Sequence, residues 1–185
     1  RDKPTIQYSG TGFVIDQGNT LVTNAHVVEA VRKDDRIEQL RVFFADDDAV
    51  RGRPATVLAV DSRHDVALIR FEGPPRPTMS LRIHDDPQQG QSVGVMGFPI
   101  GLRLGLVPAV HKGVVAAVVP AVLPLPTGVK MTPELAEALK DPYNLYQLDL
   151  LVYPGNSGSP LFDARSGQVI GIINKTLATR TREHM

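Results

Sequence analysis

The loop at residues 151–162, LVYPGNSGSPLF, contains Ser157 in a Gly-Asn-Ser-Gly sequence followed by a proline. These residue types form ordinary turns, so the pattern alone fits either a turn or the nucleophile of an acyl-transfer enzyme. A serine becomes a nucleophile when a base lies within hydrogen-bond distance of its hydroxyl, a carboxylate orients that base, and N–H donors face the developing oxyanion. This chemistry therefore requires a histidine and a carboxylate elsewhere in the chain.

Two residues far from this loop meet the requirement. His26 lies in LVTNAHVVEA, at the end of an apolar strand where the chain turns toward a helical segment. Asp65 lies in SRHDVALIRF, directly before an apolar strand expected at residues 66–71, which would place its carboxylate at the rim of a sheet. We interpret His26, Asp65 and Ser157 as base, orienting carboxylate and nucleophile. A half-buried structural role is the alternative for the histidine.

The glycine before the candidate nucleophile predicts an oxyanion hole. Gly155 can adopt backbone conformations in which its own N–H and that of Ser157 point at one position about 3 Å away. Asn156 contributes its backbone to the same loop, and Gly158 leaves room for a substrate and an imidazole ring. We therefore predict an oxyanion hole built from Gly155, Asn156 and Ser157.

The other histidines and a second carboxylate are weaker candidates for this chemistry. His64 precedes Asp65, but neighbouring side chains on an extended segment point to opposite sides, so His64 is expected to face solvent. Asp61 is expected to cap the preceding turn. The remaining histidines are predicted to be surface or loop residues, namely His84, His111 and His184.

No metal or other cofactor is expected. The consecutive Asp46, Asp47 and Asp48 lack the spaced ligands and the glycine of a calcium-binding loop, so they are predicted to form a solvated hairpin tip. The chain has no cysteine, which excludes disulfides and thiolate metal sites.

The composition limits the partners. Twenty basic residues balance twenty acidic ones, so no overall field attracts nucleic acid or an anionic membrane. The longest uncharged run, at residues 113–129, contains three prolines and is too short to span a bilayer as a helix. A chain of 185 residues that is 42% hydrophobic can bury a substantial core.

Short β-rich runs separated by turn residues dominate the chain and predict an all-β fold of about ten strands. We expect two six-stranded antiparallel barrels, at about residues 5–75 and 80–175, joined by the proline-rich stretch FEGPPRPTMS. One short helix is expected at residues 132–140, where a threonine, a proline and a glutamate form a helix start. A weaker helical turn is expected in AHVVEAVRK.

Five blocks of the chain, in order, resemble a known family. They are GTGFVID, LVTNAHVV, DVALIR, VGVMGFPIG and YPGNSGSPLFDARSGQVIGIIN, and they resemble the trypsin-like serine proteases of the HtrA (Deg) type from about residue 10 to 174. The resemblance implies a chymotrypsin-like fold with His26, Asp65 and Ser157 as the triad in the cleft between the barrels. Ser159 stands where the family usually has a second glycine.

The resemblance also implies a specificity. In a chymotrypsin-like fold the pocket is lined by the segment about six residues before the serine and by a later strand, which here are Leu151 and Val152, and Ile172, Ile173 and Asn174. Because these residues carry no charge, cleavage is expected after small or medium aliphatic residues of a polypeptide substrate.

Further expectations concern assembly and location. The family continues past this strand through a further strand and, in many members, into PDZ domains, so the 185 residues are expected to be part of a longer polypeptide, with the second barrel incomplete within them. Because they include no PDZ segment, trimer formation is not carried over from the resemblance and a monomer is expected. A periplasmic or other extracytoplasmic location follows from the resemblance alone.

The segment at residues 120–144 is expected to be an insertion. A surface ornament is favoured for it over a gate for the cleft. For the whole chain, an active endopeptidase is favoured over a silent, protease-like binding domain with a collapsed oxyanion hole.

Overall fold

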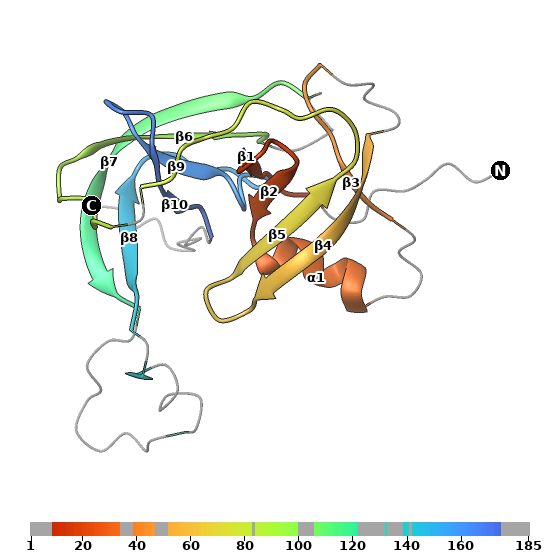
Figure 1. The fold of residues 1–185 in the computed structure, drawn as a ribbon. Coiled ribbons are helices and arrows are strands. Elements are labelled where there is room, and N and C mark those ends of the chain that lie inside the picture. The colour runs from red at the N-terminus through yellow and green to blue at the C-terminus, as the bar shows by residue number, and fades with distance from the viewer. Residues whose placement is uncertain are drawn as a thin grey trace, which may run out of the picture.

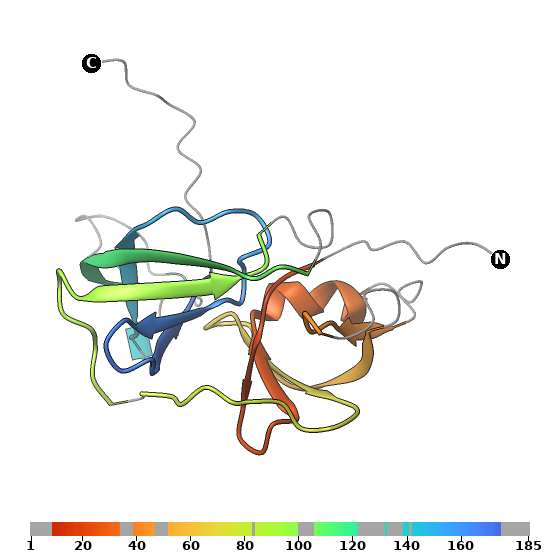
Figure 2. The same cartoon turned by 90° about the horizontal axis from the view of Figure 1, so that it is seen from above.

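The computed structural model describes residues 9–33, 39–46, 52–82, 84–99, 106–121, 132, 139–140 and 142–174. Within them the chain forms two antiparallel sheets of five strands each, which lie side by side (Figures 1 and 2). The prediction of an all-β protein in two halves is confirmed, with five strands per sheet in the described residues where six were predicted. Most of the helix predicted at 132–140, together with His184, lies outside the described residues.

The first sheet has the order β1-β2-β5-β4-β3. Its strands are β1 (Phe13–Ile15), β2 (Thr20–Thr23), β3 (Leu40–Val42), β4 (Arg53–Asp61) and β5 (Val66–Phe71). In β5 the inward side chains are Ala67, Ile69 and Phe71, while the intervening Arg70 is exposed, as period-two alternation requires. These side chains form the first core with Val14, Leu21, Val28 and Val42.

The second sheet has the order β10-β9-β6-β7-β8. Its strands are β6 (Ser92–Gly97), β7 (Ala109–Pro120), β8 (Asn144–Asp149), β9 (Pro160–Asp163) and β10 (Val169–Ile172). Its core consists of Val93, Val95, Val115, Leu161, Ile170 and Ile173. Branched aliphatic side chains dominate it because they pack well on a pleated surface.

A third apolar cluster joins the two sheets. Phe13, Ile15 and Val22 of the first sheet are buried together with Val169 of the second. Strands β1 and β2 are therefore buried on both faces, one against the first core and the other against β10. Removing such a side chain from water contributes about 1.5–3 kcal/mol, so this cluster helps fix how the two sheets face each other.

Helix α1 (Ala25–Lys33) begins directly after β2 and is longer than the helical turn expected there. Val28, on its inner face, is fully buried in the first core. That packing accounts for the extra length, because the stability of a short helix comes mainly from its buried face. No helix among the described residues is long and apolar enough to cross a membrane.

Candidate active site

His26 and Asp65 form a doubly hydrogen-bonded pair. His26 Nδ1 lies 2.7 Å from Asp65 Oδ2, and the backbone N–H of His26 donates to Oδ1 at 2.9 Å. Since an ionised carboxylate only accepts, the ring proton is on Nδ1 and Nε2 of the neutral ring is free to accept a proton. The side chain of Asp65 is 15% exposed and that of His26 is 46% exposed, so the base is open to solvent while its carboxylate is shielded.

The elements around the pair explain its geometry. His26 lies in the first turn of α1, where backbone N–H groups have no partner within the helix, and the Asp65 carboxylate accepts one of them. Asp65 itself has φ of 55°, an uncommon value for a residue other than glycine. The side-chain amide of Asn24 holds this conformation by donating to the Asp65 carbonyl at 2.9 Å.

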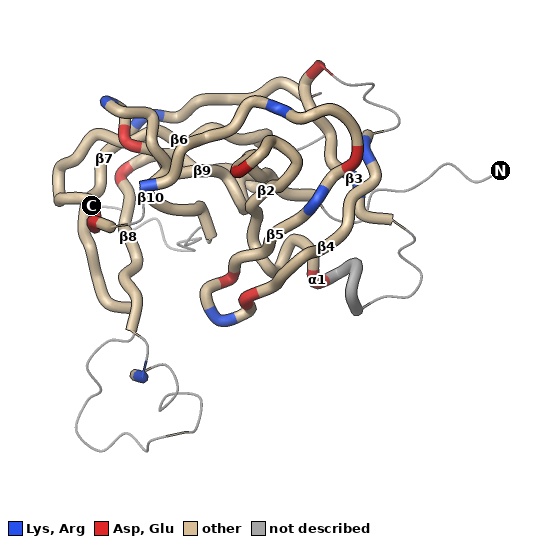
Figure 3. Tube along the Cα trace, in the orientation of Figure 1, with Lys and Arg blue, Asp and Glu red and all other residues tan. Residues whose placement is uncertain are grey.

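His64 pairs with Asp61 and not with Asp65. The Asp61 carboxylate accepts the N–H groups of Arg63 and His64, as predicted for a turn cap, and lies 2.6 Å from His64 Nδ1. The hydrogen bonds from His64 hold the pKa of Asp61 below its ordinary value. His64 is half-buried, because its ring packs edge-on against that of Tyr143, 4.7 Å away. Figure 3 shows this turn between β4 and β5 as two acidic positions flanking a basic one.

The loop around Ser157 is anchored by alternate peptide groups. The carbonyl of Gly155 accepts the Thr11 hydroxyl at 2.8 Å, and the N–H of Asn156 in the same peptide donates to the Tyr153 carbonyl at 3.1 Å. The carbonyl of Ser157 accepts the Thr11 N–H at 2.8 Å. Gly155 has φ of 98°, a conformation that favours glycine.

The N–H groups of Gly155 and Ser157 lie on either side of the first of these anchored peptides and make no hydrogen bond with any described residue. The Ser157 hydroxyl likewise has no hydrogen-bond partner in the described part of the chain. The structure thus leaves free the groups that the oxyanion-hole hypothesis needs at Gly155 and Ser157, while the N–H of Asn156 is occupied.

The Ser157 loop packs against the strand end that leads to His26. A Cβ added at Gly158 would lie 2.1 Å from the Thr11 carbonyl oxygen and 2.4 Å from Thr23 Oγ1. Thr23 ends β2, and α1 follows two residues later with His26 in its first turn. His26 and Asp65 therefore meet directly, and the Ser157 loop is brought against the same end of the first sheet.

The predicted pocket residues occupy different environments. Leu151 is 71% exposed, whereas Val152 and Ile173 pack in the core of the second sheet. Ile172 packs against the cluster between the sheets, and Asn174 Oδ1 is buried without a hydrogen-bond partner among the described residues.

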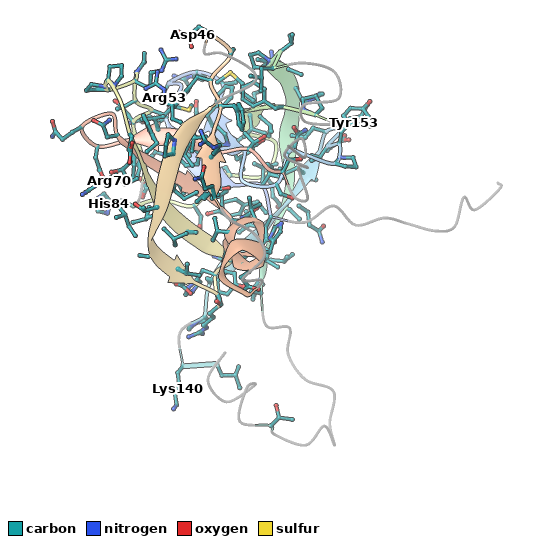
Figure 4. All side chains as sticks on the ribbon, turned by 90° about the vertical axis from the view of Figure 1, so that its right-hand side faces the viewer. Asp46, Arg53, Arg70, His84, Lys140 and Tyr153 are labelled. Atoms are coloured by element: carbon teal, nitrogen blue, oxygen red, sulfur yellow. The ribbon has the colours of Figure 1, made fainter. Side chains whose placement is uncertain are left out.

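The prediction that His111 is a surface or loop residue is wrong. His111 lies in β7 opposite Val95, its Nε2 is buried, and the centroid of its ring lies 5.7 Å from that of the Tyr153 ring. The alternation along β7 turns it inward, between the exposed Val110 and Lys112. His84 is exposed, as predicted, and lies on the side of the molecule away from Tyr153 (Figure 4).

Asp46 accepts hydrogen bonds from the Arg76 guanidinium, which lower the pKa of its carboxyl; Asp47 and Asp48 lie outside the described residues. Within the described residues, no group of three potential metal ligands occurs.

Sequence reasoning missed Thr11, whose hydroxyl reaches the Ser157 loop. The signal available in the sequence was its position between two glycines, Gly10 and Gly12. In the structure, a Cβ at either glycine would come within 3 Å of a neighbouring atom. Such crowding indicates a close approach of backbone segments, but not which segments meet.

The chain is similar to known proteins over most of its length. The family model described as a trypsin-like peptidase domain matches residues 10–172. A probable periplasmic serine endoprotease, DegP-like, of Halomonas elongata is 31% identical over 176 residues, which are 95% of this chain and 31% of that protein. The mitochondrial serine protease HTRA2 of Drosophila pseudoobscura is 32% identical over 170 residues, covering 92% of this chain and 34% of that protein. The chain thus spans about a third of the length of these relatives.

Among solved structures, the chain is similar to Rv3671c from Mycobacterium tuberculosis H37Rv, crystallised as a serine-to-alanine mutant in an inactive form. The TM-score is 0.67 at 25% sequence identity, and the match covers 91% of this chain and 70% of that one.

Proposed function

Because the chain belongs to the trypsin-like peptidase domain family, with relatives of the HtrA and DegP type, we propose that it is a serine endopeptidase. His26 is the general base, Asp65 its orienting carboxylate and Ser157 the nucleophile. The observation that carries the proposal is the pair of hydrogen bonds from His26 to Asp65, at 2.7 and 2.9 Å, at the strand end against which the Ser157 loop packs.

The reaction begins with attack of Ser157 Oγ on the scissile carbonyl carbon. His26 Nε2 takes the hydroxyl proton, and the Asp65 carboxylate stabilises the imidazolium that forms. The negative charge on the former carbonyl oxygen is met by the N–H groups of Gly155 and Ser157, which have no other described partner.

Collapse of this tetrahedral intermediate breaks the C–N bond. His26 gives its proton to the leaving amine, which departs and leaves an acyl ester on Ser157. Water then attacks the ester while His26 again acts as base, and a second tetrahedral intermediate releases the acid product and restores the serine hydroxyl.

The proposed substrate is a polypeptide with a small or medium aliphatic residue before the scissile bond. Support comes from residues 150–153 and 172–174, which contain no charged side chain and therefore nothing to pair with lysine, arginine or glutamate. Leu151, Val152, Ile172, Ile173 and Asn174 remain the proposed lining. A peptide library should be cleaved mainly after valine, alanine, leucine or isoleucine, and a profile dominated by arginine or glutamate would contradict the assignment.

Location and assembly can also be proposed. The names of bacterial relatives say periplasmic, which favours an extracytoplasmic site for this chain. A monomer is proposed for residues 1–185, and sedimentation equilibrium tests it.

A fluorophosphonate probe tests the activity directly, because it reacts covalently only with an activated serine. We expect labelling of the wild-type chain and none of Ser157→Ala, with circular dichroism and thermal melting verifying that both are folded. Folded wild-type chain that takes no label would instead indicate a protease-like binding domain.

A further inference from the structure

Thr11 connects the Ser157 loop to two other segments. Its hydroxyl donates to the Gly155 carbonyl at 2.8 Å and accepts from the N–H of Phe98, just after β6, at 3.1 Å. Its N–H donates to the Ser157 carbonyl, also at 2.8 Å. Its own carbonyl accepts the Thr23 hydroxyl at 2.7 Å.

These hydrogen bonds are internal and specific. Thr11 is 4% exposed, so water does not replace a lost partner easily. A valine of the same shape could fill the space of Thr11, but it would leave both the Gly155 carbonyl and the Phe98 N–H without their partner. The hydroxyl therefore supplies two hydrogen bonds that an apolar side chain of the same shape cannot supply.

The peptide held by the hydroxyl lies between the two that carry the free N–H groups. The Gly155–Asn156 peptide is fixed at its carbonyl by Thr11 and at its N–H by Tyr153. The Ser157–Gly158 peptide is fixed at its carbonyl by the Thr11 N–H and at its N–H by the Ile173 carbonyl, at 2.9 Å. Because a peptide group is planar, holding one end sets the direction of the other.

The restraint on the Gly155–Asn156 peptide matters because Gly155 is a flexible link. Gly155 joins the anchored peptide to the one that carries its own free N–H, and a glycine can rotate between many backbone conformations at little cost. Without the hydroxyl, one of the two contacts that select the observed conformation, with φ of 98°, would be lost.

We propose that the Thr11 hydroxyl is a positioning group that holds the Gly155 peptide so that the N–H groups of Gly155 and Ser157 face the oxyanion. The proposal rests on the proposed endopeptidase function. Thr11 touches no reacting atom, and it acts through the loop that it anchors.

Thr11→Val and Thr11→Ser separate the hydroxyl from the packing. We expect Thr11→Val to lower kcat and kcat/KM equally, by about 10- to 100-fold, because an oxyanion exists only in the transition state and the intermediates. KM should stay within about twofold, and Thr11→Ser should restore most of the rate. Thr20→Val is the matched control, since Thr20, in β2, is also a buried threonine but its hydroxyl makes no hydrogen bond in the described part of the chain.

The affinity for a transition-state analogue is a further measurement, and it should not change if Thr11 has only a structural role. A peptide boronic acid forms a tetrahedral adduct with the serine, so its affinity should fall in Thr11→Val by the same factor as kcat/KM. Binding of the matching substrate peptide, measured in the Ser157→Ala background, should be unchanged within about twofold. If Thr11→Val does not fold, Thr11→Ala, which adds no buried methyl group, is expected to give the same split.

The outcomes distinguish the two proposals. Active wild-type chain with equal kcat and boronate affinity in Thr11→Val would overturn the positioning role alone. Equal damage in Thr11→Ser and Thr11→Val would also overturn it, because the hydroxyl would then not be the group that matters. Inactive, folded wild-type chain would overturn the proposed function and, with it, the role of Thr11.

Discussion

Asp65 combines two roles at the scale of a single residue. Its carboxylate accepts the ring and the backbone N–H of the same histidine, so the orientation of the imidazole is tied to the start of α1. A negative charge near a helix N-terminus is also favourable by about 0.3–1 kcal/mol. With φ of 55°, the backbone of Asp65 is strained, and this strain accompanies the position of its carboxylate beside the helix.

Asp65→Asn should therefore lose far more activity than stability. The amide cannot accept from both His26 groups in the same way, and its NH₂ favours the wrong tautomer of the ring, so we expect kcat to fall by about 10³- to 10⁴-fold. The free energy of unfolding should fall by about 1 kcal/mol. Peptide hydrolysis and urea denaturation measure the two quantities.

Asp61→Asn is the matched control for this substitution, because Asp61 lies in the same turn and pairs with the other histidine, His64. Its amide oxygen can still accept the turn N–H groups, so kcat should stay within about threefold. Comparable losses in both variants would contradict the assignment of Asp65 as the orienting carboxylate.

Among the helices and strands, the sequence pattern predicted those features that depend on residues close together in the chain. Strand β5 was predictable because the inward Ala67, Ile69 and Phe71 alternate with other residues, and the start of α1 because the apolar spacing changes after β2. The inward side of His111 was not predictable, because the register of β7 depends on its pairing with β6. The hydrogen bond from Thr11 to Gly155 joins positions 144 residues apart, and no short-range pattern indicates such a partner.

Two glycines with similar positive φ values allow the cost of backbone strain to be measured separately from the cost of a steric clash. Gly158 has φ of 87° and Gly167 has φ of 73°, but only Gly158 has neighbours, at 2.1 and 2.4 Å from an added Cβ. Gly167→Ala should cost about 1 kcal/mol of unfolding free energy, from strain alone.

Gly158→Ala should cost about 2–3 kcal/mol more, because the Thr11 carbonyl that it would meet is backbone. It should also lower the labelling of Ser157 by the fluorophosphonate probe. Chemical denaturation of both variants measures the difference. Equal costs would mean that the loop yields easily and that its contact with β2 is not tight.

At the scale of the whole molecule, the site depends on how the two sheets face each other. His26, in α1, and Asp65, in the turn between β4 and β5, lie at the first sheet, whereas Ser157 lies in the loop between β8 and β9 of the second. The chain between β5 and β6 runs along both sheets (Figure 2), bonding to Val14 in the first through Met79 and to Val169 in the second through Ser80 and Arg82. This connection and the apolar cluster between the sheets therefore position the site.

Asp86 anchors the same connection to the second sheet. The dependence of stability on pH can test this contact. It accepts the Tyr146 hydroxyl at 2.7 Å and the Asn144 side-chain amide at 2.6 Å, both from β8. Burial, and then the hydrogen bond to Asp86, raise the pKa of Tyr146 from 10.0 to about 12. The folded protein thus binds the phenolic proton more tightly than the unfolded chain does.

This difference predicts how stability changes in alkaline solution. The contribution of Tyr146 to the free energy of unfolding is fully present below pH 10, and it is lost as the pH rises from about 10 through about 12. Tyr146→Phe lacks this titration, so its unfolding free energy should fall less steeply than that of the wild type over the same window. The substitution should also remove a component with a midpoint near 12 from the tyrosinate absorbance of the folded protein, whereas Tyr143→Phe should retain it. Parallel stability curves for wild type and Tyr146→Phe would mean that burial and the hydrogen bond to Asp86 do not raise the pKa of Tyr146 in the folded protein.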